Sequence, residues 1–111
     1  MIFLDTCILI DYSKNKLTFK KEEYCISPIV QLEFLAGALN KRELKKINLI
    51  LSEFKLIETD QDVLDLSVNL MNKYALSHNM SIYDSIIAAT CMIYDLSLWT
   101  LNEKDFRYID E

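Results

Sequence analysis

Short apolar runs alternate along this chain with longer segments in which apolar positions recur at helical spacing. The apolar runs predict strands at residues 1–4, 24–26, 55–57 and 96–101. The longer segments predict helices at residues 6–12, 28–39, 41–54, 61–76 and 82–94. Short apolar strands separated by helices form parallel sheets covered on both faces. We therefore expect an α/β fold, a three-layer α/β/α domain with a short, mostly parallel central sheet of four to five strands.

Residues that favour helix ends support several of these helices. Ser27 precedes Pro28, and a Ser N-cap followed by Pro at the first helical position is a strong helix start. Asp60 is placed to cap the fourth helix, which we expect to break at residues 77–79. The last helix, residues 82–94, is apolar almost all round, and this predicts a buried central position.

Composition limits the possible chemistry. The chain has 111 residues, of which 51% are hydrophobic and 26% charged, and this is typical of one globular domain spanning residues 1–111. A single Gly excludes glycine-rich phosphate loops, and a single His excludes HExxH zinc sites. Asp and Glu total 17 against 12 Lys and Arg, so carboxylates are the expected carriers of any chemistry.

The net charge of −5 does not indicate a surface that tracks phosphates, although it leaves nucleic-acid binding open. If a nucleic acid binds, we expect local lysine patches to hold it, with Lys20 and Lys21 as the residues to reverse in a test. Lys14 and Lys16 stand near that pair, and a second basic cluster, Lys41, Arg42, Lys45 and Lys46, is most simply the solvated face of a helix.

Cysteine usage and hydropathy indicate the compartment. The three cysteines, Cys7, Cys25 and Cys91, are far apart and set among apolar residues, which suits free thiols in a reducing environment. The N-terminus lacks the basic region of a signal peptide, and no apolar run approaches the roughly 18 residues that span a bilayer. We expect a cytoplasmic protein with no membrane contact.

Four acidic residues stand where a strand end or a core position is expected. Asp5 ends the first strand, Glu33 shares a helix face with small and apolar residues, Asp84 lies in the first turn of the most apolar helix, and Asp105 follows the last strand. Each also has an ordinary explanation: a helix N-cap, an exposed helix residue, a capping box with Ser81, and a turn residue. Taken singly, none of the four requires a function.

Together these acids suggest a common site. They lie just after consecutive strands or on the helices that follow, so we expect them to meet at the carboxyl edge of a parallel sheet. Carboxylates brought so close repel one another unless they share a proton or bind a cation. Oxygen ligands select hard ions such as Mg²⁺ or Mn²⁺, which polarise phosphodiesters and activate water. The pattern indicates metal-dependent hydrolysis of phosphodiesters.

Four segments, in this order, resemble the PIN-domain nucleases, and within that family the VapC-like toxins of type II toxin–antitoxin modules. The matching segments are residues 2–12, 27–37, 84–89 and 100–106. The resemblance implies that the four family acids correspond to Asp5, Glu33, Asp84 and Asp105 and that these hold the metal. It implies polar companions in the site at Thr6 and Asn102.

The resemblance further implies an endoribonuclease that uses Mg²⁺ or Mn²⁺ on structured RNA such as tRNA or rRNA. It implies a cognate antitoxin, whose tail often places an Arg among the acids, and a homodimer or a toxin–antitoxin hetero-oligomer. Two alternatives stay open: a PIN nuclease in RNA processing outside a toxin module, and a non-catalytic acidic α/β binding module resembling receiver domains. The receiver alternative lacks the acidic pair at the first strand, where this chain has Leu4 before Asp5.

Some positions depart from the family pattern. The chain is short and ends soon after Asp105, so the usual last edge strand is expected to be abbreviated or absent. The Gly that often precedes the last long strand is replaced by residues 95–97, and Trp99 is bulky for its position.

Other residues have ordinary interpretations. We interpret His78 as a surface or capping residue and Cys7 as a core residue rather than a nucleophile. Packing is the default for Tyr12, Tyr83 and Trp99, although each could stack on a base. The apolar helix 44–54 and the helix after Asp60 could line an antitoxin groove, although core packing accounts for most of their hydrophobicity.

Overall fold

The computed structural model describes residues 1–14 and 23–109. Its elements follow in the order β1 (Ile2–Leu4), α1 (Thr6–Ser13), β2 (Tyr24–Ile26), α2 (Pro28–Ala36), α3 (Lys41–Leu51), β3 (Lys55–Leu56), α4 (Gln61–His78), α5 (Ile82–Ile93), β4 (Ser97–Trp99) and the 3₁₀ turn η2 (Glu103–Asp105). Every predicted strand and helix is present. The boundaries differ mainly at the carboxyl ends.

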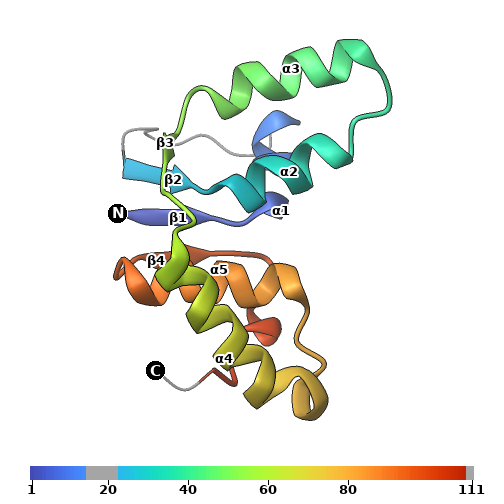
Figure 1. Cartoon of the computed structure of the whole chain (residues 1–111). Helices are drawn as coiled ribbons and strands as arrows, with labels where there is room; N and C mark the ends of the chain where they lie inside the picture. Colours follow the sequence, from blue (N-terminus) through green and yellow to red (C-terminus); the bar gives the residue numbers. More distant parts are fainter. Residues whose placement is uncertain (15–22, 110–111) are drawn as a thin grey trace.

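The described strands form a four-stranded sheet in the order β3-β2-β1-β4, and every pairing is parallel (Figure 1). Ile2 of β1 lies opposite Tyr24 on one side and Ser97 on the other, so β1 is an interior strand. The chain moves outward from β1 to β3 and then crosses back to β4. The carboxyl ends of the strands therefore meet beside β1, where the strand order changes direction.

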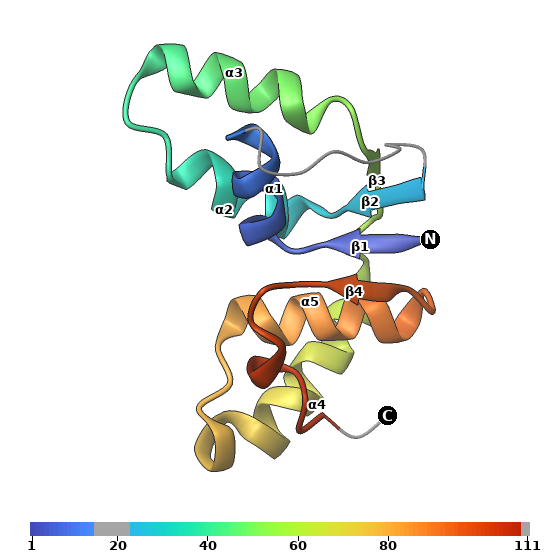
Figure 2. The ribbon, with the colours of Figure 1, turned by 180° about the vertical axis from the view of Figure 1, so that it is seen from behind.

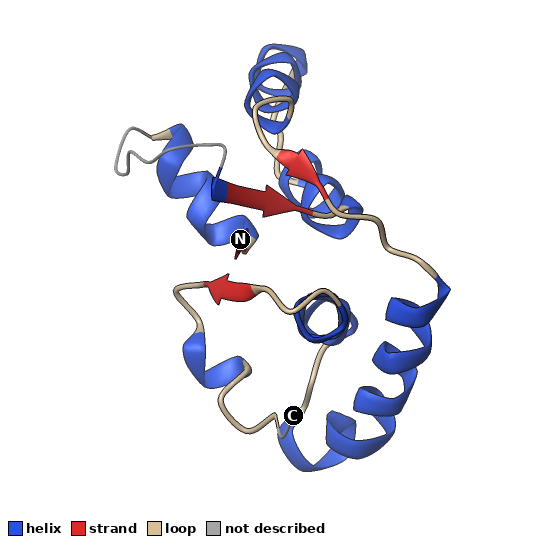
Figure 3. Cartoon of the chain, turned by 90° about the vertical axis from the view of Figure 1, so that its left-hand side faces the viewer, coloured by secondary structure: helices blue, strands red, loops and turns tan. Residues whose placement is uncertain are grey.

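Helices cover both faces of this sheet. Figure 3 shows α1 on one side of the strands and α5, with α4 outside it, on the other. Seen from behind in Figure 2, α3 lies over α2 at the β3 end, opposite the pair formed by α4 and α5. The three-layer α/β/α prediction is confirmed.

The core explains why the apolar runs become strands. Phe3 and Leu4 of β1 are completely buried, because the central strand is covered on both faces. They belong to one cluster with residues of α1, α2, α3 and α5, and a second cluster joins α4 to α5. The helix ends are less buried than predicted: Ile82 is 69% exposed although its helix is apolar almost all round.

The helix starts follow the predicted chemistry with one difference. The side chains of Asp60 and Ser81 accept hydrogen bonds from the backbone N–H groups of Val63 and Asp84. Ser27 occupies the N-cap position before Pro28, but its hydroxyl makes no hydrogen bond and is buried. Its contribution to the helix start is therefore backbone conformation rather than a side-chain cap.

Several predicted elements are shorter in the structure, most clearly the second and third helices and the last strand. The second helix ends at Ala36 rather than at residue 39, because Asn40 caps the next helix and the chain must turn between them. The last strand ends at Trp99 rather than at residue 101, because the side chain of Thr100 turns toward Asp5. Beyond it the described residues form η2 and no further strand. None of the described helices combines the length and the apolar character that crossing a membrane requires.

Candidate acidic site

A cleft of about 430 Å³ lies at the carboxyl edge of the sheet, between α1, α2 and α5. It is lined by Asp5, Thr6, Cys7, Ile10, Glu33, Ser81, Tyr83, Asp84 and Asn102. Five of the six residues predicted for the site are among them. Asp105 is not part of the lining, although its charge acts on Asp84.

Asp5 is held by donors from three different elements. Its Oδ1 accepts from the backbone N–H of Thr6 at 2.7 Å and from the hydroxyl of Tyr83 at 2.6 Å. Its Oδ2 accepts from the hydroxyl of Thr100 at 2.7 Å. The side chain is 4% exposed, and a buried carboxylate needs such partners. Asp5 caps α1, as its ordinary explanation predicts, and also faces the cleft.

Asp84 lies where the charges of the other acids meet. Its side chain is half-buried in the first turn of α5. Burial raises the pKa of this carboxyl above its ordinary value, and the negative charges of Asp105, Asp5 and Glu33 raise it further, while a hydrogen bond with Ser81 lowers it. Asp5, Glu33 and Asp84 thus line one cleft, and the charge of Asp105 acts on Asp84 from outside the lining.

The turn after β4 carries the remaining residues. The backbone N–H of Asn102 donates to the Thr100 hydroxyl at 3.0 Å, and the backbone N–H of Asp105 donates to the carbonyl of Asn102, also at 3.0 Å. The half-buried Asp105 is thereby fixed to the same segment that holds Asp5. Glu33 is exposed on α2.

Tyr83 and Thr100 are the contacts that sequence reasoning missed. Thr100 lies in the segment 100–106 that resembles the family. A hydroxyl side chain directly after the last strand could have indicated a hydrogen bond to a neighbouring acid. Tyr83 was interpreted as a packing residue, and nothing in its spacing relates it to Asp5, which is 78 residues away. Its burial and its hydrogen bond to the Asp5 carboxylate raise the pKa of the phenol, which is therefore protonated and acts as a donor.

The donor set suits a hard divalent cation. The cleft offers carboxylate oxygens from Asp5, Glu33 and Asp84 and the amide of Asn102, and this chemistry favours Mg²⁺ or Mn²⁺ over Zn²⁺. Within residues 1–14 and 23–109, no three acidic, Cys or His groups stand close enough together to ligate one ion. The donor atoms in the cleft fit a hard cation by their chemistry.

The nearby thiol and the single histidine take no part in this chemistry. Burial raises the pKa of the Cys7 thiol, whose sulfur accepts from the backbone N–H of Leu101 at 3.4 Å. Cys7 is therefore a packing residue, as predicted. His78 stacks on Tyr108, with ring centroids 4.1 Å apart, and does not line the acidic cleft.

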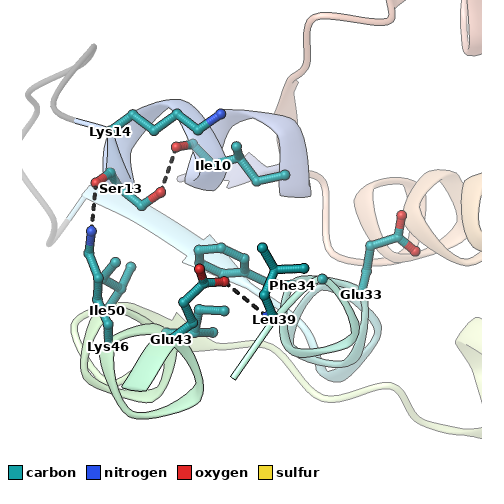
Figure 4. Close-up of a pocket in the computed structure, with 11 residues that line it drawn as sticks. Ile10, Ser13, Lys14, Glu33, Phe34, Leu39, Glu43, Lys46 and Ile50 are labelled. Atoms are coloured by element: carbon teal, nitrogen blue, oxygen red, sulfur yellow. Dashed lines mark hydrogen bonds between the residues drawn. The ribbon is translucent and has the colours of Figure 1, made fainter. Parts of the chain in front are cut away.

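A second, mostly apolar groove of about 420 Å³ lies between α1, α2 and α3. Figure 4 shows Glu33 at its rim, with the carboxyl directed away from the other lining residues. Ile10 and Glu33 line both this groove and the acidic cleft, so the two are continuous. Among the basic residues, Lys14 and Lys46 line the groove, whereas Lys16, Lys20 and Lys21 lie outside the described residues. The expected groove helix α3 is thus present, but its partners are α1 and α2 rather than α4.

A third, open cleft of about 410 Å³ shares Asn102 with the acidic cleft. Lys104 and Arg107 line it, and both are exposed. Positive side chains therefore stand beside the acids, within the segment that follows β4.

A four-stranded parallel sheet with acidic residues lining a cleft at its carboxyl edge defines an α/β protein with an acidic site. The chain matches the PIN domain over residues 2–111 and belongs to the PIN-domain family. It is 28% identical over 112 residues to Ribonuclease VapC1 of Methanocaldococcus jannaschii, covering 99% of this chain and 82% of that protein. It is 26% identical to Ribonuclease VapC of Rickettsia bellii, covering 99% of this chain and 91% of that one.

Solved structures show the same fold. A toxin–antitoxin complex from Klebsiella pneumoniae superimposes with a TM-score of 0.80 and 32% identity, covering 98% of this chain and 92% of that one. A DNA-bound VapBC structure from Salmonella typhimurium gives a TM-score of 0.82 at 24% identity, with 98% and 93% of the two chains covered. The second likeness concerns the fold alone.

Proposed function

We propose that this chain is a metal-dependent endoribonuclease and the toxin of a type II toxin–antitoxin pair. The observation that carries the proposal is the cleft at the carboxyl edge of the sheet, which is lined by the carboxylates of Asp5, Glu33 and Asp84. Its similarity to proteins named Ribonuclease VapC supports RNA as the substrate. We propose structured RNA, such as tRNA or rRNA, as the class that is cut.

Asp5, Glu33, Asp84 and Asp105 are proposed to hold Mg²⁺ or Mn²⁺. When bound, such an ion activates water and stabilises the charge that develops on the phosphate. The chain's own residues prepare the site: Thr100 and Tyr83 fix the Asp5 carboxylate, and Ser81 fixes the backbone that carries Asp84. Thr6 and Asn102, which line the cleft, are proposed to contact the substrate phosphate or the water around it.

The acids repel RNA, so positive side chains must offset them. Lys104 and Arg107, in the open cleft that shares Asn102 with the site, are proposed to contact the RNA backbone. Two exposed cations there can bind phosphates on either side of the bond that is cut.

The apolar groove between α1, α2 and α3 is proposed to receive the antitoxin. It is continuous with the acidic cleft through Ile10 and Glu33, so a segment lying in it can direct a basic side chain among the acids. The similarity to the Klebsiella pneumoniae toxin–antitoxin complex supports a protein partner. Self-association is proposed through the apolar side of α4 and α5, where Val68 is 60% and Ile82 69% exposed.

Purified protein incubated with total RNA tests the activity. We expect cleavage with Mg²⁺ or Mn²⁺, loss of cleavage with a chelator, and loss in Asp5→Asn and Asp84→Asn. Asp62→Asn is the matched control, because Asp62 also lies in the first turn of a helix but is exposed and distant from the cleft. Cleavage that persists undiminished in Asp5→Asn would contradict the proposed site.

The neighbouring reading frame and the response of cells test the toxin role. A small adjacent gene for a DNA-binding protein, together with growth arrest on induction that co-expression of this gene relieves, is the expected result. Ribonuclease activity without arrest or such a gene would instead favour a PIN nuclease in RNA processing. Mapping the ends of RNA fragments shortly after induction identifies the substrate.

A further inference from the structure

The Asp5 carboxylate has few acceptor positions left. An ionised carboxylate offers about four lone-pair sites, two on each oxygen. The Thr6 N–H and the Tyr83 hydroxyl take both positions on Oδ1, at 2.7 and 2.6 Å. The Thr100 hydroxyl takes one position on Oδ2, at 2.7 Å. One acceptor position remains, on Oδ2.

The proton assignments around Tyr83 follow from the single proton of its phenol. The phenol has a single proton, which it donates to Asp5. Its oxygen lies 2.7 Å from the hydroxyl oxygen of Thr6, so the Thr6 hydroxyl must donate to Tyr83. The Thr6 N–H also points to the phenol oxygen, at 3.2 Å. Tyr83 is thus fixed by Thr6 and cannot turn its hydroxyl away from Asp5 without losing these contacts.

We propose that Tyr83 determines which divalent cation the site selects, by blocking Oδ1 of Asp5 so that only Oδ2 is open to the ion. This inference rests on the proposed metal dependence. Mg²⁺ requires near-octahedral geometry and accepts carboxylates through single oxygens, whereas Ca²⁺ accepts both oxygens of one carboxylate. A carboxylate with one open oxygen therefore favours the smaller ion. Tyr83 acts here as a positioning residue, because its partner is Asp5 and not the ion.

The two hydroxyls that hold Asp5 have different predicted effects on selectivity. Tyr83→Phe keeps the ring and opens one position on Oδ1, so each oxygen then has one open position and Asp5 can bind through both. Thr100→Val also removes one hydrogen bond from the same carboxylate, but it opens a second position on Oδ2 and leaves Oδ1 blocked. Only the first change permits binding through both oxygens. Comparing the two variants therefore distinguishes a change in selectivity between Mg²⁺ and Ca²⁺ from a general loss of affinity for both ions.

Isothermal titration of the purified full chain with MgCl₂ and with CaCl₂ tests the inference. We expect the ratio of the Ca²⁺ Kd to the Mg²⁺ Kd to fall roughly tenfold in Tyr83→Phe, the lower end of effects seen when partners of metal ligands are changed. In Thr100→Val both Kd values are expected to rise while their ratio stays as in the wild type. Tyr12→Phe, which removes the hydroxyl that donates to exposed Glu53, is the matched control.

The outcomes distinguish this inference from the proposed function. An unchanged ratio in Tyr83→Phe, or an equal fall in Thr100→Val, would overturn the selectivity role while leaving metal dependence intact. A wild-type chain that binds neither ion, or an Asp5→Asn variant that binds as tightly as wild type, would overturn both. Tyr83→Leu removes the same hydroxyl with a different side chain, so it must shift the ratio in the same direction if Tyr83→Phe does not fold.

Discussion

The hydroxyl of Thr100 donates a 2.7 Å hydrogen bond to Oδ2 of Asp5 and thereby joins the end of β4 to the end of β1. The same hydroxyl accepts from the backbone N–H of Asn102, so one side chain fixes both the central acid and the turn that carries Asp105. The acidic cleft is thus built into the pairing of these two strands.

Removing this hydroxyl is expected to destabilise the fold. Thr100→Val leaves a buried carboxylate with one donor fewer, and an unsatisfied buried group of this kind costs about 1 to 3 kcal/mol. Thr100→Ser keeps the donor and is expected to lose less than half as much. Urea unfolding of the two variants at pH 7 measures the difference, and equal stabilities for Val and Ser would contradict it.

Neutralising Asp84 is expected to stabilise the fold at neutral pH. The folded-state pKa of this carboxyl is raised, chiefly by burial and then by Asp105, Asp5 and Glu33. Folding therefore favours the protonated form of this carboxyl. The resulting stabilisation is fully present below pH 3.8, the ordinary pKa, and it is lost as the pH rises through the higher folded-state pKa. Asp84→Asn stays neutral and should unfold at a higher temperature than wild type at pH 7, with the gap closing toward pH 4.

Asp62→Asn is the control for that measurement. Asp62 occupies the same helical turn in α4 but is exposed, so its removal only loses a favourable interaction with the helix N-terminus. A melting temperature that falls in both variants would show that the helix end, and not repulsion in the cleft, dominates at Asp84.

Reversing the charges of Lys104 and Arg107 is expected to weaken RNA binding without affecting the metal. In the doubly substituted Lys104→Glu/Arg107→Glu variant, RNA cleavage should need more substrate for half-maximal rate, and the slope of affinity against salt should decrease. Arg42→Glu/Lys45→Glu, on the exposed side of α3, is the matched control. If both double variants cleave with unchanged substrate dependence, the RNA contacts lie elsewhere, and Lys20 and Lys21 are the next residues to reverse.

Asp95 occupies a backbone conformation that favours glycine. Its φ is 53°, in the left-handed region that residues other than glycine rarely adopt. Asp95→Gly is expected to relieve the strain and raise stability by up to about 1 kcal/mol, whereas Asp95→Val is expected to lower it by more than that. Thermal unfolding of the two variants gives the comparison, and a destabilised Asp95→Gly would mean that the Asp side chain compensates for its own backbone.

The sequence predicted the order and type of every described strand and α-helix, because short apolar runs and helical periodicity are local signals. Of the four acids expected at the carboxyl edge of the sheet, Asp5, Glu33 and Asp84 line one cleft and Asp105 does not. The prediction for Ser27 was only partly right. Ser27 is the N-cap residue of its helix, but its hydroxyl is buried and makes no hydrogen bond. Whether a capping side chain reaches a free N–H depends on a rotamer, and a sequence does not reveal it.

Contacts between distant segments could not be predicted in this way. The Tyr83 hydroxyl reaches Asp5 only because α5 crosses the end of β1, and no spacing in the sequence carries that information. The residues that line the apolar groove could not be predicted from the sequence for the same reason. Its lining comes from α1, α2 and α3, whose apolar residues individually look like ordinary core positions. The roles of the acids, of Thr6 and of Asn102 stay predictions until the proposed experiments are done.

The position of β4 beside β1 has a consequence for the order in which the site is assembled during synthesis. Residues 1–93 supply β1, β2, β3 and all the long helices, yet the neighbour that orients Asp5 and the segment that carries Asp105 follow them. A nascent chain can fold its earlier elements first. It cannot complete the acidic cleft until β4 has left the ribosome and paired, so the cleft is the last part of the fold to be assembled.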